Sequence, residues 1–232
     1  MLTNLSRRTG CAVAALIGCW GSAGSISAHD VITTKLTWCR EISRIFYKRC
    51  ITCHREGGSA FDLTDYAHAR PWAEAIKEEV LERRMPPWGA VKGFGRFRDD
   101  PSLSQEDIEL ISAWVVGGAP EGERNILAPV PSLSSPKPAA PKAVAVPLRC
   151  GMPLKEAAVV AGLRPEALPN GSSLRLVAEL PDGNARPLIW IYRYPAKFPQ
   201  TYWFDGPVRM PAGTRIQMFP AGAATFSLLL QR

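Results

Sequence analysis

The stretch Cys50-Ile51-Thr52-Cys53-His54 determines which fold and which function are predicted for the first half of the chain. Two thiols three residues apart can each form a thioether to one of the two vinyl groups of a single haem. The residue that follows then presents its imidazole to the iron. This CxxCH spacing is typical of covalent haem attachment. It predicts one haem c, with Cys50 and Cys53 as anchors and His54 as an axial ligand.

Zinc binding and disulfide exchange are the alternative uses of such a cysteine pair. A structural zinc site needs four ligands. The remaining Cys and His residues beyond the first 28 positions, Cys39, Cys150, His29 and His68, are widely separated. A disulfide-exchange site is expected within a βαβ pattern, and none surrounds Cys50. Haem attachment is therefore favoured over both alternatives.

The sixth iron ligand is predicted to be Met85, in Arg84-Met85-Pro86-Pro87-Trp88. A thioether ligand favours ferrous iron and raises the reduction potential. The two prolines restrict the backbone directly after the sulfur-bearing residue. His68 is the alternative ligand, although a surface position is expected for it. Three methionines in the C-terminal part are expected to serve packing: Met152, Met210 and Met218.

Residues 1–28 are predicted to be a signal peptide. Arg7 and Arg8 precede a short apolar stretch over 10–18, and small residues follow. In an alternative interpretation, Leu16-Ile17-Gly18-Cys19 is a lipobox, and a lipid on Cys19 anchors the mature protein to a membrane. Both interpretations predict a periplasmic or exported protein, in a compartment where disulfides persist.

Three parts are predicted after the signal. Residues 29–127 read as a compact, mostly helical haem domain. Residues 128–149 are rich in proline, which indicates an extended linker. Residues 150–232 read as a β-rich partner or docking domain, so that the whole chain is classed as α+β.

Helices are expected over 37–49, over 64–84 with a new start at Pro71, and over 104–116. Ser104 and Asp107 form a capping box at the start of the third helix. Alternating apolar residues and intervening turns predict a small sandwich-like unit in the C-terminal part. The strands are expected over 173–180, 188–194, 202–204, 215–219 and 225–230.

Residues 36–118 resemble the class I cytochromes c. The resemblance rests on Phe46 four residues before Cys50, on the CxxCH motif, on the later Met-Pro-Pro and on Trp114 in the closing helix. Residues 38–66 and 83–90 look like a monohaem branch found fused to redox or copper monooxygenase domains in some bacteria. The resemblance implies a mainly helical domain whose first and last helices cross near the haem edge, with His54 and Met85 as axial ligands.

One feature departs from that family. Its members place a proline shortly after CxxCH, and the carbonyl of that proline holds the ligating histidine. Here the corresponding segment is Gly57-Gly58-Ser59-Ala60-Phe61, without proline. Another carbonyl must orient His54, and the sequence does not identify it.

Residues 201–216, TYWFDGPVRMPAGTRI, resemble a segment in the C-terminal β-sandwich of copper type II ascorbate-dependent monooxygenases. Copper favours imidazole ligands, and residues 69–232 contain no histidine. We therefore expect a related β module without copper.

Cys39 and Cys150 are left over once the haem has taken its two thiols. In an oxidising compartment a disulfide between them is expected. Closing so long a loop stabilises a protein by about 4–5 kcal/mol in the chain-entropy model. Two separate thiols are the alternative.

Charge adds a further expectation. The chain carries 28 Lys and Arg against 21 Asp and Glu, a net charge of +7. This excess is mild, so nucleic acid is not the expected partner.

Together these features predict an electron-transfer protein rather than an enzyme: a monohaem c-type cytochrome that serves redox protein partners, either free or as a subunit of a membrane-associated respiratory or oxidoreductase complex. The alternative is a haem enzyme or gas sensor whose sixth iron position is open or easily displaced.

Overall fold

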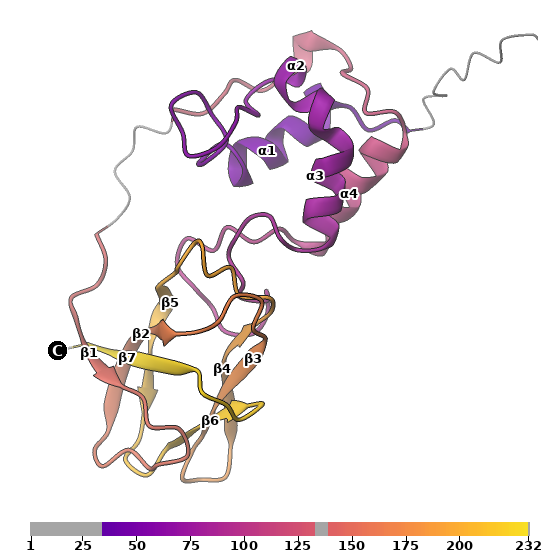
Figure 1. Ribbon diagram of the computed structural model, residues 1–232. Coiled ribbons are helices and arrows are strands. Elements are labelled where there is room, and N and C mark those ends of the chain that lie inside the picture. Colours follow the sequence, from indigo (N-terminus) through magenta and orange to yellow (C-terminus); the bar gives the residue numbers. More distant parts are fainter. Residues whose placement is uncertain (1–33, 133–138, 232) are drawn as a thin grey trace, which may run out of the picture. The chain divides into compact units, whose positions relative to one another are not determined.

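A computed structural model describes residues 34–132 and 139–231 (Figure 1). The predicted signal peptide, with Cys19, lies outside the described residues, as do positions 133–138 of the predicted linker. Among the described residues, no helix combines the length and the apolar character that crossing a membrane requires.

The helices lie in the first half of the chain, and they are short. The first helical segment starts as a π-helix and continues as α1, with the Thr37 side chain accepting a hydrogen bond from the backbone of Arg40 at its start. The predicted second helix is broken, because Pro71 falls in a 3₁₀ turn before the chain resumes as an α-helix. The bounds are η1 Trp38–Ile42, α1 Ser43–Arg49, α2 Tyr66–Ala69, η2 Arg70–Trp72, α3 Ala73–Leu81, α4 Gln105–Val116 and η3 Arg124–Ile126.

The capping box of α4 is confirmed. The Ser104 hydroxyl accepts a hydrogen bond from the Asp107 backbone N–H at 3.0 Å. The Asp107 carboxylate in turn accepts one from the Ser104 N–H at 2.9 Å. These two bonds satisfy donors that the first helical turn would otherwise leave free.

A cluster of buried aromatic side chains holds η1, α1 and α4 together. The ring of Trp38 lies 5.0 Å from that of Phe46, edge to face, and 6.1 Å from that of Trp114. All three side chains are fully buried. Trp114 also donates from its indole to the Pro120 carbonyl at 3.0 Å. The end of α1, directly before Cys50, is thereby fixed to α4.

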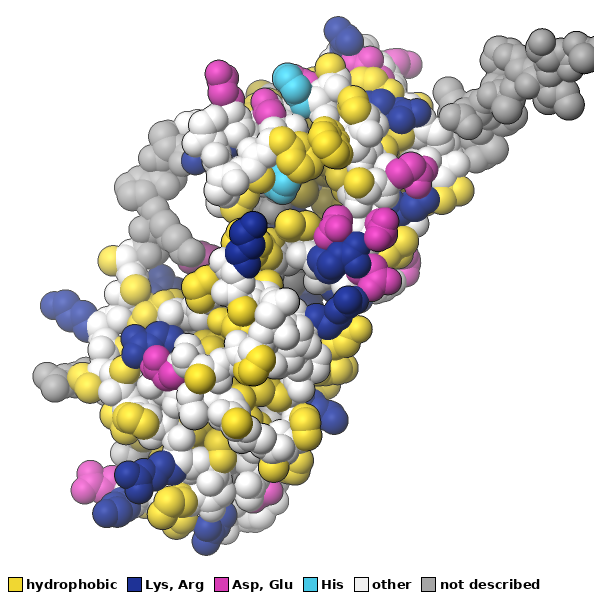
Figure 2. Space-filling model, in the orientation of Figure 1, with side chains coloured by type: hydrophobic (Ala, Val, Ile, Leu, Met, Phe, Trp, Pro, Cys, Tyr) yellow, Lys and Arg dark blue, Asp and Glu magenta, His cyan; other side chains and the backbone are white. Residues whose placement is uncertain are grey.

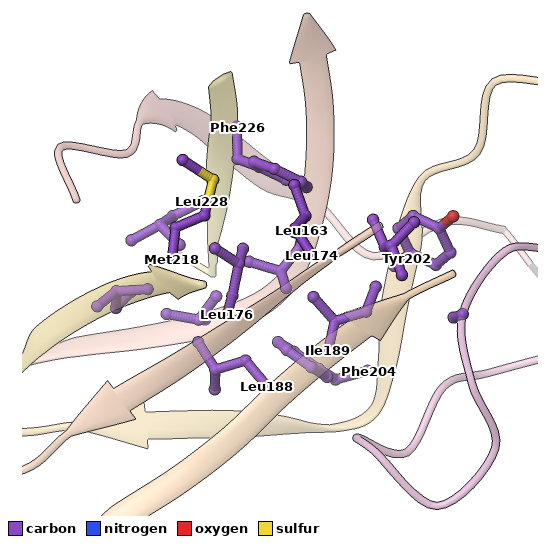
Figure 3. Packing of buried hydrophobic residues seen from close by; sticks show 14 of the residues in the cluster. Leu163, Leu174, Leu176, Leu188, Ile189, Tyr202, Phe204, Met218, Phe226 and Leu228 are labelled. Carbon is purple, nitrogen blue, oxygen red and sulfur yellow. The ribbon is translucent and has the colours of Figure 1, made fainter. Parts of the chain in front are cut away.

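Two antiparallel sheets form the second half. One sheet has the order β1-β7-β2-β5 and the other the order β4-β3-β6. Their facing side chains share one apolar cluster (Figure 3), which includes Leu163, Leu176, Ile189 and Phe226. The strands are β1 Ala143–Pro147, β2 Ala158–Ala167, β3 Leu174–Glu179, β4 Ala185–Ile191, β5 Tyr202–Met210, β6 Arg215–Phe219 and β7 Thr225–Gln231.

Two strands were not predicted, and two others have different bounds: β4 covers Ala185–Ile191 instead of 188–194, and β5 covers Tyr202–Met210 instead of 202–204. Strand β1 lies inside the predicted linker 128–149 and pairs with β7. Strand β2, which was not predicted, lies between β7 and β5. Its register shifts next to Gly162 and after Pro165, and a Cβ atom on Gly162 would come within 2.6 Å of the Tyr202 carbonyl oxygen. Glycine and proline inside a strand mark such irregularities, and they hide the strand pattern in the sequence.

The predicted fold class is wrong. A mainly helical class I cytochrome c domain followed by a small all-β domain was expected, but the described chain is mostly strands, in two antiparallel sheets. The longest of its described helices, α4, has 12 residues. The physical reason lies in the segments between helices. Residues 50–65 and 82–103 are turns and loops, and part of the second segment packs into the β core rather than adding helix.

Candidate haem-attachment site

The CxxCH motif is held in a tight turn at the end of α1. Cys50 donates from its backbone to Phe46, and His54 donates to the Cys50 carbonyl at 2.9 Å. Cys53 donates to the same carbonyl at 3.1 Å. Because Phe46 is fully buried, the aromatic group beneath α1 fixes the start of this turn. The two cysteines and the histidine therefore project from a rigid base.

The orientation of His54 is set by a backbone carbonyl. Its ring Nδ1 lies 3.0 Å from the carbonyl oxygen of Phe61, and the rings of the two residues meet edge to face at 4.8 Å. A carbonyl oxygen only accepts, so Nδ1 must carry the proton. This leaves Nε2 with its lone pair free for a metal. Phe61 thus supplies the orienting carbonyl that the sequence did not identify.

A short return of the chain brings that carbonyl into place. Ala60 donates from its backbone to Cys53 at 3.1 Å, and Leu63 donates to His54 at 3.2 Å. Gly58 donates to Arg55 at 2.9 Å. Residues 55–61 therefore form a closed turn over the motif, and this turn brings the Phe61 carbonyl to His54.

The thiol of Cys50 differs from those of thiol-exchange sites. Burial, with smaller contributions from the charges of Asp107 and Cys53, raises the pKa of Cys50 to about 12. Thiol exchange uses the thiolate, and exchange sites lower the thiol pKa, often at a helix N-terminus. Here the motif follows the C-terminal end of α1. No group of three or more His, Cys, Asp or Glu side chains gathers in metal-binding fashion anywhere in residues 34–132 and 139–231.

Met85 is held from both directions along the chain. Upstream, Arg84 and Met85 both donate backbone hydrogen bonds to the carbonyl of Glu79 in α3. Downstream, Trp88 donates to the Pro86 carbonyl at 2.8 Å. Met85 is partly buried and lines a pocket with an empty volume of about 430 Å³, open in part to solvent. The apolar side chains of the helical part that share this pocket are Val80, Leu103 and Ile108.

Four buried side-chain atoms make no hydrogen bond to the described residues: Arg49 Nε, Trp38 Nε1, Ser43 Oγ and Trp88 Nε1. Of these, Arg49 lies directly before Cys50, whereas Trp88 is buried in the β core. A buried donor left unpaired costs about 1–3 kcal/mol. Carboxylates are suitable acceptors for a guanidinium and an indole, and haem carries two of them. Arg49 Nε and the free Nε2 of His54 therefore fit a haem. The pocket that Met85 lines includes none of Cys50, Cys53 and His54.

The other candidate residues lie elsewhere. Asp65 is the N-cap of α2 and accepts a hydrogen bond from the His68 backbone N–H. Its carboxylate also lies 2.8 Å from the ring Nδ1 of His68, and this hydrogen bond raises the pKa of His68. Met210 and Met218 are buried in the β core, as expected, whereas Met152 is 55% exposed.

The predicted disulfide between Cys39 and Cys150 is not formed. Both residues are free thiols in the structure. Cys39 is fully buried in the helical cluster, whereas Cys150 is exposed in a turn between β1 and β2. The pairing was predicted because both thiols remain after haem attachment. The sequence around each cysteine does not reveal that one is buried and the other exposed.

Charge on the described surface is mixed. On the face shown in Figure 2, basic side chains are interspersed with acidic and apolar ones and form no continuous patch. Several basic residues near the site are neutralised locally. Arg84, for example, pairs with Glu78 and Glu79 at 2.9 and 3.0 Å.

Comparisons with protein-family models, with curated proteins and with solved structures find nothing that matches this chain. Function must therefore be argued from the geometry of the site itself.

Proposed function

We propose that this chain is an electron-transfer protein that carries one covalently attached haem c. Cys50 and Cys53 would anchor the group, and His54 and Met85 would be its axial ligands. The observation that carries the proposal is the hydrogen bond between His54 Nδ1 and the Phe61 carbonyl, at 3.0 Å. It accompanies a CxxCH motif and leaves the metal-binding nitrogen free.

His54 has the support that ligating histidines need. Such histidines donate their second ring N–H to a carbonyl or carboxylate, which fixes the ring and makes it a stronger ligand. Here the donor is Nδ1 and the acceptor belongs to a turn closed by backbone hydrogen bonds. A histidine with only a structural role would not require this arrangement beside two cysteines.

Met85 supports electron transfer rather than catalysis. The backbone on both sides of it is held by hydrogen bonds to Glu79 and Pro86, so its thioether has a restricted reach. A haem iron supplies one-electron chemistry, and a methionine ligand raises its potential. A protein that keeps both axial ligands leaves no open position for a substrate, and electrons pass to redox protein partners instead.

The site of action follows from the same proposal. Thioether attachment of haem takes place outside the cytoplasm, which agrees with the signal peptide predicted over residues 1–28. We propose a periplasmic or exported carrier, either free or associated with a membrane complex.

The test is the absorption spectrum of the exported protein, oxidised and reduced, with and without carbon monoxide. Wild type should show low-spin c-type bands that carbon monoxide does not change. Met85→Ala should bind carbon monoxide in the ferrous state and lower the reduction potential, because the thioether that favours ferrous iron is gone.

Met152→Ala is the matched control, since Met152 is exposed in the β half, and it should behave as wild type. A protein without covalent haem would refute the proposal. Ready binding of carbon monoxide by wild type would point to a haem enzyme or gas sensor instead.

A further inference from the structure

Residues 88–98, which follow Met85, pair with the exposed edges of both sheets. Near the start of this loop, Val91 donates to the Trp190 carbonyl of β4 at 2.8 Å. Near its end, Arg98 donates to the Trp203 carbonyl of β5 at 2.8 Å. Strands β4 and β5 are edge strands of their sheets, so the loop satisfies backbone groups that would otherwise be open.

The side chains of the loop complete the same core. Trp88, Ala90 and Phe97 are buried in the cluster that the two sheets share. The ring of Phe97 is stacked on that of Phe204 at 5.5 Å. These residues belong to the first half of the sequence, yet they pack as part of the β half.

Tyr202 is bonded to the chain three residues after Met85. Its hydroxyl donates to the carbonyl oxygen of Trp88 at 2.7 Å, and the two rings meet edge to face at 4.9 Å. Tyr202 is fully buried, and in Figure 3 its hydroxyl points out of the leucine cluster. Burial raises the pKa of Tyr202, so the hydroxyl keeps its proton and remains a donor.

We propose that the two-sheet unit holds the Met85 segment in place, with Tyr202 as its positioning residue. This inference rests on the proposed function, in which Met85 is an iron ligand. Only Pro86 and Pro87 separate Met85 from Trp88, and each has a fixed φ angle. Whatever fixes Trp88 therefore limits where the sulfur of Met85 can lie. The unit predicted to dock partners acts, in this proposal, on the sixth iron position.

The first test compares Tyr202→Phe with Tyr194→Phe in the full chain. Tyr194 is buried in the same core, but no hydrogen bond joins its hydroxyl to residues 86–98 among those described. We expect Tyr202→Phe to speed hydrogen exchange at the Val91 and Arg98 amides by about tenfold, since one buried hydrogen bond to the loop is lost. Tyr194→Phe should leave these two amides as they are in wild type.

A second pair of variants changes residues of the loop and leaves the residues of the strands as they are. A Cβ atom on Gly95 would lie 2.3 Å from the Leu188 carbonyl oxygen of β4, so Gly95→Ala must push the loop away from the sheet. Gly93 has a similar positive φ but nothing within 4 Å of a Cβ atom. Gly93→Ala therefore introduces the same kind of backbone strain without the clash, and it should leave exchange at Arg98 close to wild type.

Carbon monoxide binding to the reduced haem is the second readout. Tyr202→Phe and Gly95→Ala should allow carbon monoxide to displace Met85, and their two controls should not. Unchanged amide exchange in both variants would overturn the inference. So would faster exchange with no carbon monoxide binding, in a background where wild type carries a low-spin haem. A wild type without haem would overturn the proposed function instead, and amide exchange would still report whether the sheets hold the loop.

Discussion

Gly58 offers a direct test of how His54 is oriented. It lies in the turn of residues 55–61 that carries the Phe61 carbonyl to the imidazole. A Cβ atom at this position would lie 2.3 Å from the Cys53 carbonyl oxygen and 3.0 Å from the Cγ and carbonyl oxygen of Arg55. Backbone atoms cannot swing aside as a flexible side chain can. Gly58→Ala must therefore open the turn.

The size of the opening follows from these contacts. Carbon and oxygen atoms pack without repulsion at about 3.5 Å, so the turn must open by about 1 Å. The hydrogen bond from His54 to Phe61 is 3.0 Å long, and such a bond is lost beyond about 3.2–3.5 Å. The cost of the overpacking is about 1–3 kcal/mol in the free energy of unfolding. Loss of a ligand's hydrogen-bond partner weakens metal binding by about 10–100-fold.

Gly57→Ala is the matched control. Gly57 has φ +68° and nothing within 4 Å of a Cβ atom. An alanine there costs about 1–2 kcal/mol through its left-handed backbone but displaces no neighbour. The two variants should thus have comparable thermal stability and differ at His54.

The assay is the ¹⁵N NMR signal of the His54 ring in the full chain, together with the spectrum of the reduced haem. In wild type and Gly57→Ala we expect Nδ1 to be protonated and the haem to be low-spin. In Gly58→Ala the Nδ1–H signal should shift and exchange faster with water, because its carbonyl acceptor is lost, and the haem should show a high-spin fraction. Identical His54 signals in the two variants would refute the reasoning that the turn of residues 55–61 orients the ligand.

Two further predictions concern stability and pH. Ser104→Ala removes the capping box of α4 and should lower the free energy of unfolding by about 1 kcal/mol in a urea titration; an unchanged midpoint would contradict this. Asp65→Asn keeps an N-cap oxygen for α2 but removes the charge that raises the pKa of His68. The pairing should stabilise wild type fully below the ordinary His pKa of about 6.5, and this contribution should vanish as pH rises through the raised value. An NMR titration in which His68 has the same pKa in both proteins would contradict the assignment.

The parts of the fold that the sequence predicted are those set by short-range physics. The capping box of Ser104 and Asp107 needs residues only three positions apart, and it is confirmed. Strands β3, β6 and β7 were predicted close to their observed bounds because apolar residues alternate and turns separate them. In each case the information lies within one element.

The residues that the sequence could not supply depend on contacts between distant segments. The orienting oxygen of Phe61 belongs to the backbone, so its residue type carries no signal of its role. Tyr202 acts on the carbonyl of Trp88, far away in the sequence. Its position in an aromatic-rich stretch was visible, but the partner was not. Both contacts follow from the three-dimensional arrangement of segments and leave no motif in the sequence.

The wrong fold class has the same origin. Apolar residues at helical spacing correctly placed α1 and α4, and the resemblance then extended that character over the whole of residues 29–127. The loop of residues 88–98, with Trp88, Ala90 and Phe97, was assigned to the haem domain because it lies between two predicted helices. In the structure they belong to the β cluster.

The packing of the 88–98 loop in the β core makes the two halves of the chain depend on each other. Met85 is attached upstream to α3 through Glu79, and three residues downstream the chain is bonded to Tyr202 of β5. Without the strands, the three apolar side chains of the loop would lose the core in which they are buried. The backbone donors of the loop would also lose their acceptors, and with them several hydrogen bonds. The helical part supplies His54 and its turn, and Arg49 of α1 donates to the Asp100 carbonyl just beyond the loop at 2.8 Å. The loop itself is bonded to β4 and β5, through Val91 and Arg98. If Met85 is the iron ligand that we propose, a six-coordinate iron would therefore depend on both halves, because the loop that follows Met85 is packed into the β core.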